Sequence, residues 1–238
     1  MACLLISIGR CSSVKQAEIT KSEILSLNKP LPLVLIGGGG HASVLADILL
    51  GQGREILAVI CPDDVSSRAA LAGIPHLTQD EDIARFSPDS VRLVNGIGMM
   101  PRSTFRQRIN EKFLAQGYVF ETVIASDAKV SSFAEVKSGA QIFPGARVHT
   151  GAIIGEHTIV NSEALIEHDC RIGAYNHIAP HATLCGDVFT AEDVYIGANA
   201  TVIQGLILEL QSVVGAGAIV TQSLKKGSTC YPARVYIK

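Results

Sequence analysis

Tryptophan is absent from this chain of 238 residues, and aromatic residues make up only 5% of it. Because 47% of the residues are nevertheless hydrophobic, small aliphatic side chains must build most of the core. A net charge of −2 excludes the strongly basic surface that is typical of nucleic-acid-binding proteins. No apolar run approaches the roughly 20 residues that a membrane span needs. The apolar start, Met1–Ile8, lacks the positive charges of a signal peptide.

The cysteines lack a pattern as well. None of the six forms a Cys-x-x-Cys pair, and they lie scattered at Cys3, Cys11, Cys61, Cys170, Cys185 and Cys230. This spacing indicates neither a disulfide framework nor a structural zinc site. It favours a protein of the reducing cytoplasm, and we expect no bound metal.

A six-residue repeat runs through the second half of the chain. Every sixth residue from Ile124 to Val220 is Ile, Val or Leu at sixteen of seventeen positions, and only Thr190 departs from the pattern. Four residues after most of these positions comes a small side chain: Ala128, Ala134, Ala140, Ala146, Ala152, Thr158, Ala164, Cys170, Ala182, Ala200 and Ala218. Neither a helix of period 3.6 nor a strand of period 2 can keep this phase.

A hexapeptide period is typical of a parallel β-helix. Each repeat forms one short side of a triangular prism, three sides make a coil of about 18 residues, and residues 124–224 then form about five to six coils. The aliphatic residue points inward, and the small residue lies near a corner. A two-sheet sandwich would need turn signals every 8–12 residues and would not keep a six-residue phase.

The first half of the chain alternates between strand and helix patterns. The sequence predicts buried strands over 33–36, 56–60 and 91–94, helices over 42–50 and 102–116, and a bridging strand near 118–123. Alternating β and α elements of this length predict a small, doubly wound, Rossmann-like sheet. Residues 1–30 have weak patterning, with one possible helix over 18–27, and no assignable role.

A glycine-rich loop follows the first predicted strand. Gly37-x-Gly39-x-x-Ala42 matches a phosphate-binding fingerprint, in which glycines let the backbone and a helix N-terminus approach a pyrophosphate. Asp63 and Asp64, at the end of the second strand, are candidates to hold a ribose or base. The region is about half the size of a full dinucleotide-binding fold, so a nucleotide carrying a sugar fits better than NAD. A tight turn without a ligand is the alternative.

The Gly-Gly-His loop, the small α/β unit and a hexapeptide block, Ile166-Glu167-His168-Asp169-Cys170-Arg171-Ile172-Gly173, together resemble the sialic acid O-acetyltransferase superfamily. Residues 32–235 are similar in particular to its members that N-acetylate nucleotide-linked 4-amino-4,6-dideoxy sugars of the bacillosamine, perosamine and viosamine type. The resemblance implies a left-handed β-helix, acetyl-CoA as the donor and a homotrimer.

The resemblance also implies roles for particular residues. His168 would be the general base, Asp169 would raise its basicity, and Asn161 would lie near the site. Acetyl-CoA would be contacted by His177, Ala198 and Ala216, and the nucleotide sugar by Gly39, Gly40, His41, Asp63, Asp64 and Gly98. Two features depart from the family pattern: Cys230 replaces a C-terminal glycine, and residues 1–30 have no counterpart.

The coil length adds a geometric expectation. Residues 18 apart stack on adjacent coils, so Gly186 should lie directly over His168, leave room for a thioester and offer its N–H as the oxyanion donor. His177 is nine residues, or half a coil, from His168 and should therefore lie on a different edge. The two histidines can serve one site only if it forms between subunits, which favours an obligate oligomer.

We therefore expect three segments: an extension over 1–30, a Rossmann-like nucleotide-sugar domain over 31–121 and a left-handed β-helix acetyltransferase domain over 122–238. The predicted function is acetyl-CoA-dependent N-acetylation of a nucleotide-linked 4-amino-4,6-dideoxyhexose in the cytoplasm, without nucleic-acid or membrane partners. O-acetylation of a sugar such as sialic acid is the nearest alternative.

Two alternatives come from other classes of protein. A zinc carbonic anhydrase would use several of the seven histidines, whereas a scaffold would use none. His177 and His181 are four residues apart, but a hexapeptide coil does not bring such residues together as a helix does. His149, His157 and His181 are interpreted as solvent-exposed surface residues.

Overall fold

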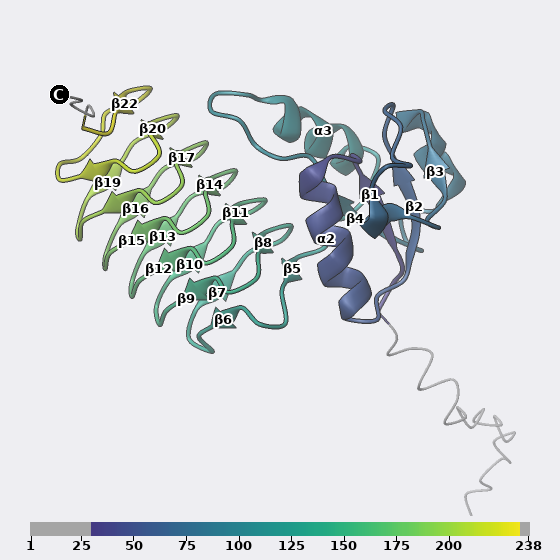
Figure 1. Cartoon of the computed structure of the whole chain (residues 1–238), viewed down its shortest axis with the longest axis horizontal. Helices are drawn as coiled ribbons and strands as arrows, with labels where there is room; N and C mark the ends of the chain where they lie inside the picture. The colour runs from purple at the N-terminus through teal and green to yellow at the C-terminus, as the bar shows by residue number, and fades with distance from the viewer. Residues whose placement is uncertain (1–29, 234–238) are drawn as a thin grey trace, which may run out of the picture. The chain divides into compact units, whose positions relative to one another are not determined.

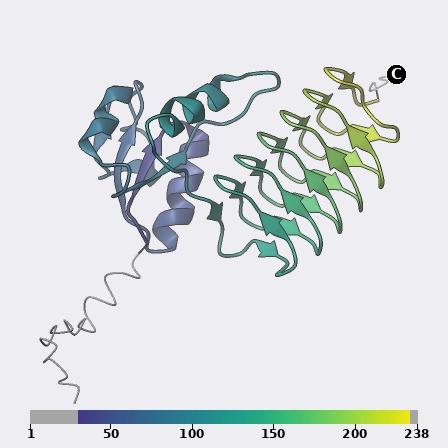
Figure 2. The same ribbon diagram turned by 180° about the vertical axis from the view of Figure 1, so that it is seen from behind.

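The computed structural model describes residues 30–233, and Figures 1 and 2 show its elements from opposite sides. An α/β region comes first in the chain, and a stack of short coils follows it from β5 to β22 (Figure 1). Most of the predicted extension and the possible helix over 18–27 lie outside the described residues. Among the described helices, none is long and apolar enough to cross a membrane.

Four parallel strands form the α/β sheet in the order β3-β2-β1-β4. The strands are β1 (Leu33–Ile36), β2 (Ile56–Ile60), β3 (His76–Leu77) and β4 (Arg92–Asn95); the helices are α2 (Gly40–Gly51), α3 (Phe105–Leu114) and the short 3-10 turns η1 (Ala69–Leu71) and η2 (Asp80–Arg85). Alternate side chains of β1 face opposite ways: Leu33 and Leu35 pack with α2, and Val34 and Ile36 pack in the cluster that contains Phe113 of α3. The sheet is therefore covered on both faces.

The predicted strands over 33–36 and 56–60 are confirmed, and the strand over 91–94 and both helices are confirmed with shifted ends. The predicted strand near 118–123 is wrong in extent, because only Phe120 makes a single bridge, to Leu93, before β5 begins at Val123. Strand β3 was not predicted, since two residues are too few to show a period.

Eighteen two-residue strands form the β-helix, arranged in three parallel sheets. The seven-stranded sheet contains β5 (Val123–Ile124), β8 (Gln141–Ile142), β11 (Ile159–Val160), β14 (His177–Ile178), β17 (Tyr195–Ile196), β20 (Val213–Val214) and β22 (Thr229–Cys230). The six-stranded sheet contains β6 (Lys129–Val130), β9 (Arg147–Val148), β12 (Leu165–Ile166), β15 (Thr183–Leu184), β18 (Thr201–Val202) and β21 (Ile219–Val220). The five-stranded sheet contains β7 (Glu135–Val136), β10 (Ile153–Ile154), β13 (Arg171–Ile172), β16 (Phe189–Thr190) and β19 (Ile207–Leu208).

The register confirms a coil of 18 residues. Ile153 pairs with Arg171, and Arg171 pairs in turn with Phe189, so each strand lies 18 residues from its neighbour on the next coil. The second residue of the strand points into the prism and is fully buried in most coils, as the six-residue period predicts. Parallel sheets stacked in this way are typical of the left-handed β-helix, and the predicted fold class is confirmed.

The single exception in the inner aliphatic series, Thr190, has a polar partner. Its Oγ1 accepts a hydrogen bond from the Nδ2 of Asn176 at 2.5 Å and another from the Gly173 N–H at 3.2 Å. Asn176 is itself fully buried, and its Oδ1 accepts from the Val194 N–H. A buried amide left unpaired would cost about 1–3 kcal/mol, so the hydroxyl at Thr190 satisfies a neighbour inside the prism.

The turns between strands form three edges of the prism. We call edge A the turns between the seven- and six-stranded sheets (such as 161–164), edge B those between the six- and five-stranded sheets (such as 167–170), and edge C those between the five- and seven-stranded sheets (such as 173–176). The outer face of the seven-stranded sheet contacts the α/β region, since Ile159 shares a hydrophobic cluster with Leu45 of α2. Edge B is opposite that sheet.

Candidate functional site

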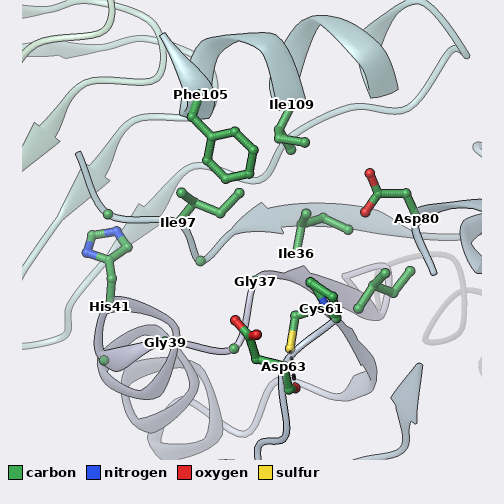
Figure 3. A pocket seen from close by; sticks show the side chains of 16 residues that line it. Ile36, Gly37, Gly39, His41, Cys61, Asp63, Asp80, Ile97, Phe105 and Ile109 are labelled. Atoms are coloured by element: carbon green, nitrogen blue, oxygen red, sulfur yellow. Dashed lines mark hydrogen bonds between the residues drawn. The ribbon is translucent and has the colours of Figure 1, made fainter. Parts of the chain in front are cut away.

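A cavity of about 530 Å³ opens where the carboxyl ends of β1, β2 and β4 meet. In the strand order β3-β2-β1-β4 the chain changes direction between β1 and β4, and ligands of doubly wound sheets bind at this switch point. Figure 3 shows the side chains around it. The lining residues are Ile36, Gly37, Gly38, Gly39, Gly40, His41, Ile60, Cys61, Pro62, Asp63, Asp80, Gly96, Ile97, Gly98, Phe105 and Ile109.

The glycines of the loop serve different purposes. A Cβ at Gly38 would lie 2.5 Å from the Cys61 Sγ, so close packing requires that glycine. A Cβ at Gly39 would meet nothing within 4 Å, and its φ of −78° suits any residue. The fold therefore does not require glycine at position 39. Because Gly39 has no side chain, the space beside it in the cavity stays open. No acidic side chain lies in the first turn of α2 to neutralise its N-terminal N–H groups.

His41, in that first turn, lines the cavity and reaches the β-helix. Its Nε2 lies 2.8 Å from the Oε1 of Gln141 on β8, and its ring stacks on Phe143 with centroids 4.9 Å apart. Burial and the nearby positive charge of Arg106 lower the pKa of His41 to about 3. His41 is therefore neutral at physiological pH and can offer a hydrogen bond without carrying charge.

Five of the six predicted nucleotide-sugar residues line the cavity: Gly39, Gly40, His41, Asp63 and Gly98. Asp64 does not. Its carboxylate accepts hydrogen bonds from the N–H and hydroxyl of Ser66, so its side chain is occupied by the local turn instead. Asp80 of η2 and Phe105 of α3 also line the cavity, and sequence reasoning missed both because neither follows a predicted strand.

His168 and Asp169 form a hydrogen-bonded pair on edge B. The Nδ1 of His168 lies 2.9 Å from the Oδ2 of Asp169, and both side chains are exposed. The hydrogen bond to this carboxylate raises the pKa of His168 above its ordinary value. Because Nδ1 donates to the carboxylate, Nε2 carries the lone pair and is free to accept a proton.

Gly186 lies over His168 on the next coil, as predicted. A Cβ at Gly186 would lie 2.5 Å from the His168 Nε2, so the glycine leaves room for the ring in this position. The flanking N–H groups donate to backbone carbonyls, from Cys185 to Val202 and from Asp187 to His168. Within residues 30–233 the N–H of Gly186 itself has no backbone acceptor.

The remaining predicted site residues lie away from edge B. Asn161, Ala198 and Ala216 lie on edge A, where Ala198 accepts a hydrogen bond from Gly217. His177 lies on the outer face of the seven-stranded sheet, where it is only 6% exposed and stacks on Tyr195 at 4.9 Å. Burial lowers its pKa to about 4. Within one chain these residues and His168 therefore do not form a single site.

One histidine differs from its prediction. His157 was expected on the surface, but it is 5% exposed, because its ring packs between Phe120 and Tyr175 where the β-helix meets the α/β region. His149 and His181 are exposed, as predicted. In the part of the chain that the structure describes, no group of three or more His, Cys, Asp or Glu side chains is arranged to hold a metal ion.

Three family models match the chain. The PglD N-terminal domain matches residues 32–113, the six-repeat bacterial transferase hexapeptide matches 151–186, and the hexapeptide repeat of succinyl-transferase matches 192–222. The first match spans the α/β sheet with the glycine loop, and the second includes His168, Asp169 and Gly186. Both halves of the candidate site therefore fall within recognised modules.

Solved structures combine the same two modules. PerB, a perosamine N-acetyltransferase from Caulobacter crescentus in complex with CoA and GDP-perosamine, is 28% identical with a TM-score of 0.76, over 84% of this chain and 93% of that chain. The acetyltransferase domain of PglB from Neisseria gonorrhoeae, in complex with acetyl coenzyme A, is 27% identical with a TM-score of 0.78, over 87% and 99%. WeeI from Acinetobacter baumannii, 24% identical with a TM-score of 0.73 over 84% and 96%, shares the fold.

Replacing Asp169 tests the pair directly. In Asp169→Asn the imidazolium loses its charged partner, so the pKa of His168 should fall towards its ordinary value in an NMR titration of the ring. In an assay of turnover, the acidic limb of the kcat/KM profile should move to lower pH, because an imidazole with a lower pKa stays neutral at lower pH.

Asp187→Asn is the matched control. Asp187 occupies the equivalent turn position one coil later and raises the pKa of His168 less than Asp169 does. Its replacement should lower that pKa by a smaller amount. A pKa of His168 that is unchanged in Asp169→Asn would show that the pair does not set the basicity of the imidazole.

Proposed function

Since the chain is a hexapeptide-repeat acetyltransferase with a PglD-type N-terminal domain, we propose that it transfers an acetyl group from acetyl-CoA to the amine of a nucleotide-linked 4-amino-4,6-dideoxyhexose. One observation carries the proposal. The same chain holds two features: a cavity at the switch point of the α/β sheet, where nucleotides bind in such folds, and the His168–Asp169 pair, whose free Nε2 faces Gly186.

The cavity suits the acceptor substrate. The open space at Gly39 and the N-terminal N–H groups of α2 provide a place for the phosphates. Asp63 is available for the ribose hydroxyls, and the apolar side chains of Phe105 and Ile109 form a wall for the base. His41 lies at the end of the cavity that borders the β-helix, where we place the sugar.

His168 is the proposed general base. Its Nε2 accepts the proton of the sugar amine as the nitrogen attacks the thioester carbonyl, and Asp169 stabilises the imidazolium that forms. The N–H of Gly186 is the proposed donor to the oxyanion of the tetrahedral intermediate. Collapse of that intermediate breaks the C–S bond, and the imidazolium of His168 returns its proton to the sulfur, so that CoA leaves as the thiol.

We further propose that the active site forms between subunits of a homotrimer. The cavity borders the seven-stranded sheet through the His41–Gln141 contact, whereas His168 lies on edge B, opposite that sheet. A second copy must therefore bring its edge B to the cavity. The proposed acetyl-CoA contacts, at His177, Ala198 and Ala216, would then lie across from His168 of that copy. Gly186 would contribute its contact to acetyl-CoA from edge B.

Exposed apolar side chains support packing between copies. Phe189 and Ile207 project from the five-stranded sheet, Ile219 projects from the six-stranded sheet, and Phe133 lies on edge B between the two. Large apolar side chains gathered on the two free sheets favour a protein partner over water. We also place the protein in the cytoplasm, where acetyl-CoA is available and where its four described cysteines would remain free thiols.

The proposal predicts acetyl-CoA-dependent release of a thiol with nucleotide-linked 4-amino sugars. A panel of uridine, thymidine and guanosine diphosphate 4-amino-4,6-dideoxyhexoses, with free sialic acid alongside, should show turnover only with one or more amino sugars. His168→Ala should lower kcat roughly 10²–10⁴-fold, because the amine proton loses its acceptor. The KM for acetyl-CoA should change little.

His149→Ala provides the control, since it removes an exposed histidine from the preceding coil of the same edge. Its kcat should stay near that of the unaltered enzyme. Turnover of sialic acid in preference to every amino sugar would favour O-acetylation instead. Normal turnover by His168→Ala at saturating substrate would place the base elsewhere.

The glycine loop predicts a separate effect on the acceptor. Gly39→Val fills space that is open in the cavity, and its backbone angle accepts valine without strain, so the KM for the nucleotide sugar should rise roughly tenfold or more. The KM for acetyl-CoA should not change. Gly51→Val is the matched control, because its Cβ also meets nothing within 4 Å, at the opposite end of α2. An equal KM for the nucleotide sugar in Gly39→Val and Gly51→Val would show that the glycine loop is a turn that does not contact the substrate.

The interfacial site predicts the oligomeric state. Light scattering should give a mass of about three times 25.2 kDa under assay conditions. Mixing His168→Ala subunits with Gly39→Val subunits, at a nucleotide-sugar concentration well below the raised KM of Gly39→Val, should also give more activity than either variant alone, because one interface can then combine an intact cavity with an intact base. A monomer with full activity would contradict the interfacial site.

A further inference from the structure

Gln141 on β8 connects the β-helix to two separate parts of the nucleotide cavity. Its side chain is 1% exposed. Its Nε2 donates a hydrogen bond of 2.8 Å to the carbonyl oxygen of Asn95, at the end of β4. Its Oε1 lies 2.8 Å from the Nε2 of His41, at the start of α2. One amide of the β-helix therefore contacts both segments that flank the switch point of the α/β sheet.

These contacts determine which nitrogen of His41 carries hydrogen. A backbone carbonyl can only accept, so the amide nitrogen of Gln141 must face Asn95, and its oxygen must face His41. An amide oxygen also only accepts, so the Nε2 of His41 must donate to it. In the neutral ring, Nδ1 then has no hydrogen and is an acceptor. Within residues 30–233 the Nδ1 of His41 makes no hydrogen bond.

The surroundings keep this imidazole neutral. Besides Gln141 and Phe143, the charged and titratable groups that act on His41 are Arg106 of α3 and His177 of β14. Arg106 is 3% exposed and positively charged, and it opposes a second positive charge on His41. The carboxylates of Asp63 and Asp80 line the same cavity, but burial and the charge of Arg106 still lower the pKa of His41. His41 is thus an uncharged acceptor in the cavity.

We propose that Gln141 is a positioning residue that fixes His41 in the Nε2–H tautomer, so that its Nδ1 accepts a hydrogen bond from a hydroxyl or amine of the bound nucleotide sugar. This role rests on the proposed function and deepens it, because it assigns the sugar end of the cavity a specific acceptor. The amide acts through His41 and does not touch the substrate.

Burial and the hydrogen-bond partner together explain why the two site histidines differ. The hydrogen bond to the Gln141 amide by itself raises the pKa of His41, but burial and the charge of Arg106 lower it by more. His168 donates to a carboxylate, which raises its pKa and makes it a base. His41 donates to an amide in a buried site, which lets it orient a substrate donor without taking its proton. A carboxylate at position 141 would therefore turn His41 into a cation and its Nδ1 from an acceptor into a donor.

Two substitutions separate these effects. In Gln141→Glu, His41 should be an imidazolium at pH 7, and the KM for the nucleotide sugar should rise about three- to tenfold, the loss of one hydrogen bond. The defect should shrink as the pH rises and His41 loses its proton. In Gln141→Met, which removes both hydrogen bonds without adding charge, the KM should rise without that recovery. The KM for acetyl-CoA should stay unchanged in both.

The ring nitrogens of His41 can be observed without substrate. In ¹⁵N NMR of the unaltered protein, His41 should show a protonated Nε2 and an unprotonated Nδ1, and in Gln141→Glu both should be protonated. Gln52→Glu is the matched control, because the Gln52 amide also bridges the two regions, donating to the carbonyl of Ile124 at 2.7 Å, but has no histidine partner. It should leave both the tautomer and the acceptor KM unchanged.

The outcomes separate the two proposals. An Nδ1–H tautomer in the unaltered protein would overturn the role of Gln141, even if the Gln141 variants fail to fold. An unchanged acceptor KM in folded Gln141→Glu with a protonated His41 would overturn it as well. If no amino sugar is acetylated, the proposed function fails, while the NMR measurement still decides the tautomer.

Discussion

Hydrogen bonds between strands in a register of 18 residues hold the β-helix together, and they limit where any side chain of that region can lie. The register places Ile153, Arg171 and Phe189 in line on one sheet and Gly186 over His168 on one edge. Residues that differ by six or twelve positions lie on other sides of the prism. A site on the β-helix of one chain can therefore use only residues that stack on the same sheet or edge, together with their immediate neighbours. A site that combines residues from different sides of the prism needs the surface of another domain or another copy of the chain.

The α/β region and a second copy of the chain supply such surfaces. The α/β region covers the seven-stranded sheet, where Gln141 reaches His41 and where His157 and His177 become buried. This cover leaves edge B as the most distant part of the prism, and edge B carries His168 and Asp169. A chain that places its acceptor cavity and its proposed base on opposite sides cannot use both in one reaction by itself, which is the physical reason for proposing an assembly.

The sequence predicts the β-helix well because each inner position needs the same kind of side chain. Ile142, Val160 and Ile178 are all fully buried and differ only in shape, so the period survives without knowledge of the structure. The position of Gly186 over His168 followed from the coil length alone. The glycine loop and Asp63 were predictable for a similar reason, since the carboxyl ends of parallel strands meet at one edge.

The outward positions could not be predicted in this way. Gln141, His157 and Asp80 owe their roles to elements far away in the sequence that pack against them, and no local period marks such contacts. Gln141 occupies an outer strand position that Lys129 and Glu135 also occupy elsewhere, where they are exposed. What distinguishes it is the docked α/β region, which buries the amide and supplies a carbonyl and an imidazole at hydrogen-bonding distance. Leaving the buried amide of Gln141 unpaired would cost free energy. The packing of the α/β region on the β-helix therefore depends on His41 donating from Nε2, and that tautomer depends in turn on this packing.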